Sequence, residues 1–273
     1  MYGCIWLKGV TLDGEYKEFS SMPPSYWIKL SLKSKPKDIF SRLLLDDDNK
    51  STEHIAVSKI LEKKYQDAIK FLLKTEEKEP YVYSTASNLA VAYELSGDFK
   101  SAIYWMKEAL KRNPNSHYNT EWLHLYILKS ELKIKKGELS LKNNLLITLP
   151  KKYNDNTLID IDGQKHSVKD IRKALIYQLK ERTIFVKPKD EIVANLFYTL
   201  AEIEANTRVV NEAIEMLKFS KLYGFNNSKL IDDKISEYQK SYIYAVLRYL
   251  LYAIVFIFIY SYLRRYIIKI FKK

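Results

Sequence analysis

The chain has 273 residues, 47% of them apolar and 14% aromatic, so it is long enough to bury a substantial core. Only 7 glycines and 7 prolines argue against a turn-rich sheet fold and favour long helices. A single cysteine, Cys4, excludes an intramolecular disulfide and a thiolate zinc cluster. The net charge of +12 is carried mainly by lysine, whereas base reading usually recruits arginine.

Residues 1–48 are predicted to form an N-terminal hairpin and a linker. Asp13-Gly14, within GVTLDGEYKEF, is typical of a tight β-hairpin turn. The next stretch, SMPPSYWIKLSLKSKPKD, has the composition of a linker, and we expect Trp27 to dock on the first helices of the following region. The start, MYGCIWLK, has too short an apolar run before Lys8 for an export signal.

Residues 49–144 carry a repeating pattern, most clearly in the unit 83–116. Two amphipathic segments are joined there at Ser96-Gly97-Asp98, and the second ends before Pro114. Alanines recur where two helix backbones would approach closely, and aromatic residues stand where the gap between them is wider. These positions are Ala90, Ala102, Ala109, Tyr93 and Phe99.

Shifting the pattern by 34 residues tests whether it repeats. In the preceding unit, 49–82, Ala68 and Pro80 fall under Ala102 and Pro114. In the following unit, 117–137, the first helix is present, but Lys136 stands where the second helix needs alanine. We therefore expect two repeats and a half repeat, after which the array is interrupted.

Residues 145–166 break the helical period and are predicted to form an irregular insertion with a β-hairpin. Apolar residues flank Asp162-Gly163, a dipeptide suited to a turn with positive φ. An EF-hand calcium loop is excluded, because Leu158 and Lys169 stand at its first and twelfth ligand positions.

Residues 167–240 are predicted to return to degenerate repeat-like helices. Ser167 and Asp170 form a capping box that opens a helix. In the unit 194–227, Leu200-Ala201 and Ala213 match the offsets of the earlier repeats, but Glu204 replaces the aromatic residue between the helices.

Residues 243–263 are predicted to form a transmembrane helix, because only Arg248 interrupts these 21 residues with a charge. Such a helix is about 31 Å long, close to the roughly 30 Å of bilayer hydrocarbon. The basic tail, 264–273, favours a cytoplasmic tail and an extracytoplasmic repeat domain. The alternative is a tail-anchored protein with its repeats in the cytosol. Either way, we expect a single-pass membrane protein.

The unit 83–116 resembles the tetratricopeptide repeat at the positions of Leu89, Ala90, Tyr93, Ala102, Ala109 and Pro114. More widely, the chain resembles bacterial membrane-anchored tetratricopeptide proteins of unassigned function. The resemblance implies an all-α solenoid of helical hairpins, here with the small β-hairpin insertion and the C-terminal transmembrane helix.

The same resemblance implies a scaffold that binds a partner protein or peptide in a concave groove. The first helix of each pair supplies the groove residues, which are here Ser84, Ser87, Asn88, Val91, Glu94, Tyr118, Glu121, Trp122, Leu125 and Lys129. Asn88 matches one position of the carboxylate clamp of chaperone-binding members, but Glu53 and Val57 replace the clamp's lysine and asparagine in the first repeat. Recognition of a chaperone tail is therefore not expected.

Catalytic and cofactor-binding motifs do not appear in the sequence. The histidines show no metal-ligand spacing; His117 and His124 lie seven residues apart and are interpreted as satisfied or solvated side chains. We expect no catalytic residue, cofactor or metal. The leading hypothesis is a membrane-anchored interaction scaffold. The alternatives are a protein that binds nucleic acid or acidic lipid, and an enzyme with an unrecognised site.

Overall fold

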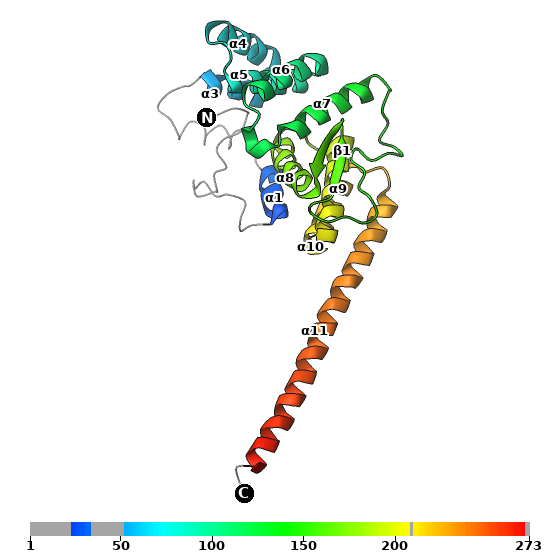
Figure 1. Cartoon of the computed structure of the whole chain (residues 1–273). Coiled ribbons are helices and arrows are strands. Elements are labelled where there is room, and N and C mark those ends of the chain that lie inside the picture. The colour runs from blue at the N-terminus through cyan, green and yellow to red at the C-terminus, as the bar shows by residue number, and fades with distance from the viewer. Residues whose placement is uncertain (1–22, 34–51, 208–209, 271–273) are drawn as a thin grey trace.

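The computed structural model describes residues 23–33, 52–207 and 210–270 of the chain. Figure 1 shows a group of short helices at one end, a second group of helices beside a β-hairpin, and a long helix that leads away to the C-terminus. The first group, which we call the hairpin stack, consists of α3 (Thr52–Leu61), α4 (Tyr65–Lys78), α5 (Tyr83–Leu95) and α6 (Phe99–Arg112). The other elements are α1 (Pro24–Lys33), η1 (Ser116–Asn119), α7 (Glu121–Lys135), β1 (Leu158–Ile161), β2 (Gln164–Ser167), α8 (Val168–Phe185), α9 (Glu191–Thr207), α10 (Val210–Tyr223) and α11 (Ser228–Ile270).

In the hairpin stack each helix packs on the next one along the chain, and α7 packs in the same way on α6. Between α5 and α6, Ala90 and Ala102 are fully buried in one cluster with Met106, and Tyr93 and Phe99 pack against this cluster. Small residues let the two backbones approach, and the aromatic rings fill the wider part of the gap. The predicted meeting of Ala90, Ala102 and Tyr93 within one helical pair is confirmed.

Local signals set the turn between α5 and α6 as the sequence predicts. Gly97 has a φ of +82°, a left-handed conformation in which a residue with Cβ is strained. Asp98 then caps α6, because its side chain accepts a hydrogen bond from the Ser101 N–H at 3.1 Å. The chain therefore reverses sharply and α6 runs back along α5.

The repeat stops after α7, and the described residues 136–157 contain neither helix nor strand. This segment is nonetheless anchored to the helices beside it. Leu146 and Ile147 are buried in the core. The Tyr126 hydroxyl donates to the Leu146 carbonyl at 2.7 Å, and the Asn195 side chain accepts from the Leu146 N–H at 3.4 Å.

The predicted β-hairpin is present, with β1 and β2 paired antiparallel and Ile161 opposite Gln164. Asp162 and Gly163 form its turn with φ values of 56° and 80°, as expected for an Asp-Gly hairpin. Helix α8 begins directly after β2, and its cap is the one that the sequence predicts. The Ser167 hydroxyl accepts from the Asp170 N–H at 3.1 Å.

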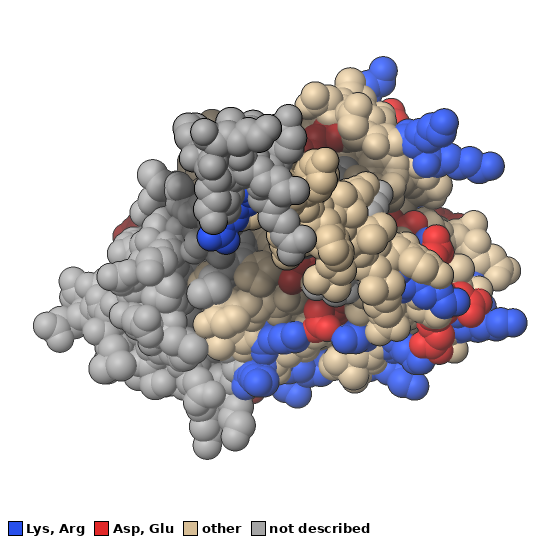
Figure 2. Space-filling view, turned by 90° about the horizontal axis from the view of Figure 1, so that it is seen from below, with Lys and Arg blue, Asp and Glu red and all other residues tan. Residues whose placement is uncertain are grey.

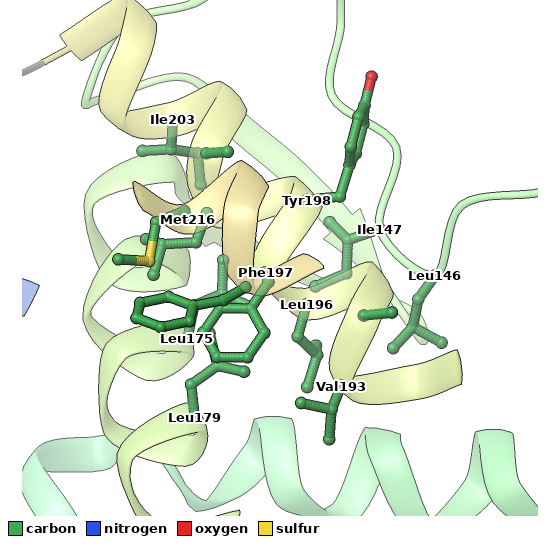
Figure 3. Close-up of a cluster of buried hydrophobic side chains, with 14 of the residues drawn as sticks. Leu146, Ile147, Leu175, Leu179, Val193, Leu196, Phe197, Tyr198, Ile203 and Met216 are labelled. Atoms are coloured by element: carbon green, nitrogen blue, oxygen red, sulfur yellow. The ribbon is translucent and has the colours of Figure 1, made fainter. Parts of the chain in front are cut away.

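Helices α8, α9 and α10 enclose the largest apolar cluster, which we call the α8–α10 core. Figure 3 shows Leu175 and Leu179 of α8 facing Phe197 of α9 and Met216 of α10. Phe197 is fully buried, and its ring lies 5.2 Å from that of Phe219 and 5.5 Å from that of Tyr223. The most extensive contact of this core is between the successive helices α9 and α10, and α1, which lies far away in the chain, packs on α8 and α10.

Helix α1 lies within the segment that the sequence suggested to be a linker. Its first residue is Pro24, whose fixed φ and missing N–H suit the first turn of a helix. Trp27 is buried, and the Lys180 ammonium lies 5.2 Å from its ring centre. Trp27 thus docks on α8 and not on the first helices of the stack, because α1 packs beside α8 and α10. The predicted hairpin at Asp13-Gly14 lies outside the described residues.

Helix α11 contains the residues that were expected to cross a membrane. Within the part of the chain that the structure describes, no helix has a stretch both long and apolar enough to span a bilayer. The predicted transmembrane helix at 243–263 is therefore wrong, and so is the predicted localisation as a single-pass membrane protein.

Candidate functional site: a charged cavity between α5, α7 and α8

A cavity of about 40 Å³ lies where the stack meets α8, and it is partly open to the surface. Its apolar wall includes Val91 and Phe185, which are half-buried. Its polar wall is formed by Glu94 of α5, His124 of α7, and Gln178, Glu181 and Arg182 of α8. The three residues of α8 share one face, because they are spaced by three and four positions along the helix.

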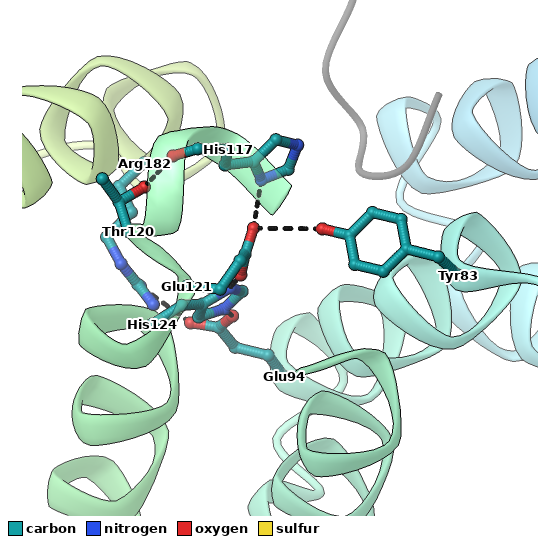
Figure 4. A network of polar contacts seen from close by, with 7 residues as sticks. All are labelled: Tyr83, Glu94, His117, Thr120, Glu121, His124 and Arg182. Carbon is teal, nitrogen blue, oxygen red and sulfur yellow. Dashed lines mark hydrogen bonds and ion pairs between the residues drawn. The ribbon is translucent and has the colours of Figure 1, made fainter. Parts of the chain in front are cut away.

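Glu94 is the centre of an ion network that joins the three helices (Figure 4). One of its carboxylate oxygens lies 2.7 Å from Arg182 Nη1, and the other lies 2.7 Å from His124 Nε2. The side chains of Glu94, His124 and Arg182 are 10%, 7% and 8% exposed, respectively. Because each buried charge faces an opposite charge, the network avoids the large penalty of an isolated ion in the interior.

Glu121 extends this network toward the start of α7. Its side chain is 1% exposed and contacts the Nδ1 atoms of both His117 and His124, the second at 3.5 Å. The Tyr83 hydroxyl of α5 also donates to Glu121 at 3.4 Å. The His117 ring is stacked on Tyr177 of α8, with ring centres 5.0 Å apart. Among the described residues, no group of three His, Cys, Asp or Glu side chains is placed to hold a metal ion.

The backbone before α7 is strained. His117, Tyr118 and Asn119 have φ values of 48°, 59° and 64°, a left-handed conformation that is uncommon for residues with a side chain. The Thr120 hydroxyl donates to the His117 carbonyl at 2.7 Å and supports this turn. Such strain persists only where the surroundings hold it, and here it directs the His117 ring toward Glu121.

The network sets the charges of its members. Burial alone would raise the pKa of Glu94, but Arg182 and His124 outweigh it and lower that pKa to about 2. Burial opposes protonation of His124, but Glu94 and Glu121 raise its pKa to about 9. Burial likewise opposes ionisation of Glu121, whose pKa His117 and His124 hold well below its usual range. At neutral pH, therefore, Glu94 and Glu121 are anions and His124 is a cation.

Two further carboxyls beside the network behave in the opposite way. Burial raises the pKa of Glu131 to about 7, and the nearby charge of Asp190 adds to this shift. Burial also raises the pKa of Glu181, which lines the cavity. Both carboxyls are therefore easier to protonate than ordinary glutamates.

Helix α8 also carries buried hydrogen-bond donors close to the cavity. Arg182 uses Nη1 for Glu94, whereas its Nε and Nη2 atoms are buried and have no hydrogen-bond partner among the described residues. The same holds for Nε2 of Gln178, a residue that is 2% exposed. Unpaired buried donors of this kind are uncommon in folded proteins, in which ordered water often satisfies them.

The ten predicted groove residues are divided by the structure into separate environments. Glu94 and Val91 line the cavity, and Glu121 belongs to the ion network. Ser84, Ser87 and Asn88 are buried, and both amide atoms of Asn88 lack a hydrogen-bond partner among the described residues.

The other predicted residues, from η1 and α7, contact different parts of the fold. The Trp122 ring is stacked on His166, with ring centres 3.6 Å apart. Lys129 forms an ion pair with Asp162, and Leu125 packs against the α5–α6 cluster. Tyr118 is 42% exposed, with the Lys173 ammonium 5.3 Å from its ring centre. These residues do not line one continuous groove.

Sequence reasoning missed Arg182, Glu181 and Gln178. No signal near them in the sequence pointed to α5, because Glu94 and Arg182 are 88 positions apart and meet only when α8 folds back against the stack. The pairing of Glu121 with His124 could have been found. His124 follows Glu121 by three residues, a spacing that places both on one face of α7, whereas His117 lies before the helix and reaches Glu121 from the preceding turn.

A family model described as a domain of unknown function (DUF6340) matches residues 54–133. The matched segment runs from α3 into α7, so it includes Glu94, Glu121 and His124 but not α8. No curated protein matches the chain. The tetratricopeptide resemblance is neither confirmed nor contradicted by the family match.

Proposed function

We propose that this protein is a helical-repeat scaffold that binds a partner protein or peptide around the cavity between α5, α7 and α8. The observation that carries the proposal is the junction itself. A partly open cavity lies between the stack and α8, and ion pairs hold its charged wall in a fixed arrangement. Preorganised charged groups beside an apolar rim favour recognition, because little side-chain entropy is lost on binding.

The charge pairing supports binding in preference to catalysis. Clusters of residues with perturbed pKa values mark functional sites of either kind. A general base, however, must be free to take a proton from a substrate. His124 instead lies between Glu94 and Glu121 and keeps its proton at neutral pH, since its pKa is raised to about 9.

The pairing of surface lysines with acidic residues favours the scaffold over a protein that binds nucleic acid or acidic lipid. Several surface lysines lie beside acidic side chains, as in the ion pairs of Lys218 with Glu215, Lys221 with Asp232, and Lys29 with Glu215. In Figure 2, Lys and Arg side chains along the lower margin likewise lie next to Asp and Glu. Binding to phosphate backbones favours an extended surface of positive charge.

The test is direct binding of a partner that has been identified by capture on the full chain and then purified. Val91 lies on the apolar side of the cavity, so Val91→Arg should weaken that binding at least about tenfold by placing a charge in the contact. Tyr104→Arg is the matched control, because Tyr104 is 59% exposed on α6 and does not line the cavity. Equal affinity of the wild type and Val91→Arg, or failure to obtain any directly binding partner, would contradict the proposal.

A further inference from the structure

We propose that the face of α8 and α10 beneath α1 is a binding site for a short amphipathic helix. In this structure α1 occupies the site, and a helix of the same pattern from a second molecule can take its place. Lys180, Glu212 and Glu215 contact α1 and do not line the cavity described above. The inference therefore goes beyond the proposed function and does not depend on it.

Helix α1 has the form of a bound peptide. It packs on α8 and α10 (Figure 1) and is only 10 residues long. Isolated helices shorter than about 12–15 residues are marginal in water. Among the described residues, no backbone–backbone hydrogen bond joins α1 to another element. The helical form of α1 therefore depends on side-chain contacts with α8 and α10, as in a peptide that folds when it binds.

The buried face of α1 has the anchor spacing of a helix bound in a groove. Buried residues occupy positions i, i+3, i+4 and i+7 of one stripe along the helix, and they are Pro24, Trp27, Ile28 and Ser31. Trp27 is 8% exposed and lies beside Lys180, and Ile28 is fully buried in the α8–α10 core. Tryptophan is one of the residue types that most often dominate the binding energy of an interface. The site thus favours a helix with an aromatic anchor followed by an aliphatic one.

Two carboxylates of α10 select the direction and the charge of the bound helix. The Ser25 N–H donates to one oxygen of Glu212 at 3.0 Å, and the Ser25 hydroxyl donates to the other oxygen at 2.9 Å. Glu212 thus caps the first turn of α1, where unpaired N–H groups and the helix dipole favour a negative charge. Lys29, one turn further along, forms an ion pair with Glu215 at 2.6 Å. The site therefore favours a helix that begins with a small hydroxyl residue and carries a lysine next to its apolar anchors.

The test offers the same helix to the full chain as a separate molecule. The probe is a fluorescently labelled peptide of residues 23–33, and fluorescence anisotropy measures its affinity. In the wild type, the tethered α1 competes with the probe at a roughly millimolar effective concentration. Trp27→Ala with Ile28→Ala removes the anchors of α1 and leaves the residues of α8 and α10 unchanged. We expect saturable binding to this double variant, at least about tenfold tighter than binding to the wild type.

Further changes assign the binding to the α1 site. A probe with Trp27→Ala lacks the aromatic anchor and should bind at least about tenfold more weakly. Glu212→Gln, added to the double variant, should reduce the affinity for the probe about fivefold, because it removes the charge from the cap of the bound helix. Asp233→Asn is the matched control, since it removes the same charge from an exposed position of α11. Where the double variant fails to fold, Ser25→Glu replaces it, because a second carboxylate beside Glu212 weakens the docking of α1.

Any of four results would overturn the inference. The probe fails to bind saturably to the variants with weakened α1, or it binds them no more tightly than it binds the wild type. The probe with Trp27→Ala binds as well as the unchanged probe, or Asp233→Asn weakens binding as much as Glu212→Gln does. None of these results bears on the scaffold proposal, whose test concerns the cavity and Val91→Arg.

Discussion

The hairpin stack and the α8–α10 core bury their apolar residues in different ways. In the stack, each helix packs on its neighbour in the chain, and the contact between α5 and α6 is made largely by alanines. In the core, large side chains from α8, α9 and α10 meet the segment after α7 and the start of α11 in one cluster. Both regions thus use contacts between successive helices, but the core also includes contacts from a distant segment, since α1 packs on α8 and α10.

This difference explains where the charged cavity lies. In a stack of helical hairpins, each hairpin contacts only its neighbours. The face formed by the first helix of each hairpin is therefore left uncovered. In this protein α8 reaches that face, and Ile184 and Phe185 at its end pack against the cluster formed by α3, α4 and α5. The ion network and the cavity occupy this junction.

The largest expected effect is in the α8–α10 core. Phe197→Ala should reduce the free energy of unfolding by about 3–5 kcal/mol, because Phe197 is fully buried and its removal leaves a cavity among packed rings. Chemical denaturation measures the change. Tyr104→Ala, at an exposed aromatic residue of the stack, should alter stability by less than about 0.5 kcal/mol. Similar losses in the two variants would contradict the assigned core.

The next effect is a dependence of stability on pH at the junction. The pKa of His124 rises from its ordinary value of 6.5 to about 9 on folding, so its stabilising contribution is fully present below pH 6.5 and is lost as the pH rises through 9. The shift corresponds to roughly 3 kcal/mol. Unfolding curves from pH 6 to pH 10 test this, and His124→Gln should flatten the profile. A wild-type profile identical to that of His124→Gln would exclude this role.

A smaller effect is expected from overpacking the stack. Ala102→Leu should reduce stability by about 1–3 kcal/mol, because Ala102 is fully buried where α5 and α6 approach closely. Lys107→Leu, at an exposed position of the same helix, provides the control and should be nearly neutral. Equal stability of Ala102→Leu and Lys107→Leu would contradict the close packing of α5 against α6.

The smallest effect concerns the cap of α6. Asp98→Ala removes the acceptor of the Ser101 N–H and should reduce stability by about 1 kcal/mol. Asp98→Asn keeps an oxygen that can accept the same hydrogen bond and should retain most of the wild-type stability. Thermal unfolding of both variants makes the comparison, and an equal loss in the two would show that the charge matters and the cap does not.

The sequence predicted the features that depend on neighbouring residues. The alanine and aromatic spacing indicated the α5–α6 pair, Asp162-Gly163 indicated the hairpin, and Ser167 with Asp170 indicated the start of α8. It failed where distant segments decide the outcome. The place of Trp27 against α8 and the pairing of Glu94 with Arg182 depend on how α8 folds back. The predicted membrane span was also wrong, since no helix among the described residues is both long and apolar enough to cross a bilayer.

The central claim, that α8 closes the open face of the stack through Glu94 and Arg182, is tested most directly by a double-mutant cycle. The cycle compares Glu94→Gln, Arg182→Met and the double variant with the wild type by chemical denaturation at pH 7. Each single change removes one side of a buried ion pair and leaves the other charge in place, so we expect the losses to be non-additive, with a coupling energy above about 1 kcal/mol. Additivity to within about 0.5 kcal/mol would show that the two side chains do not meet and would contradict the account.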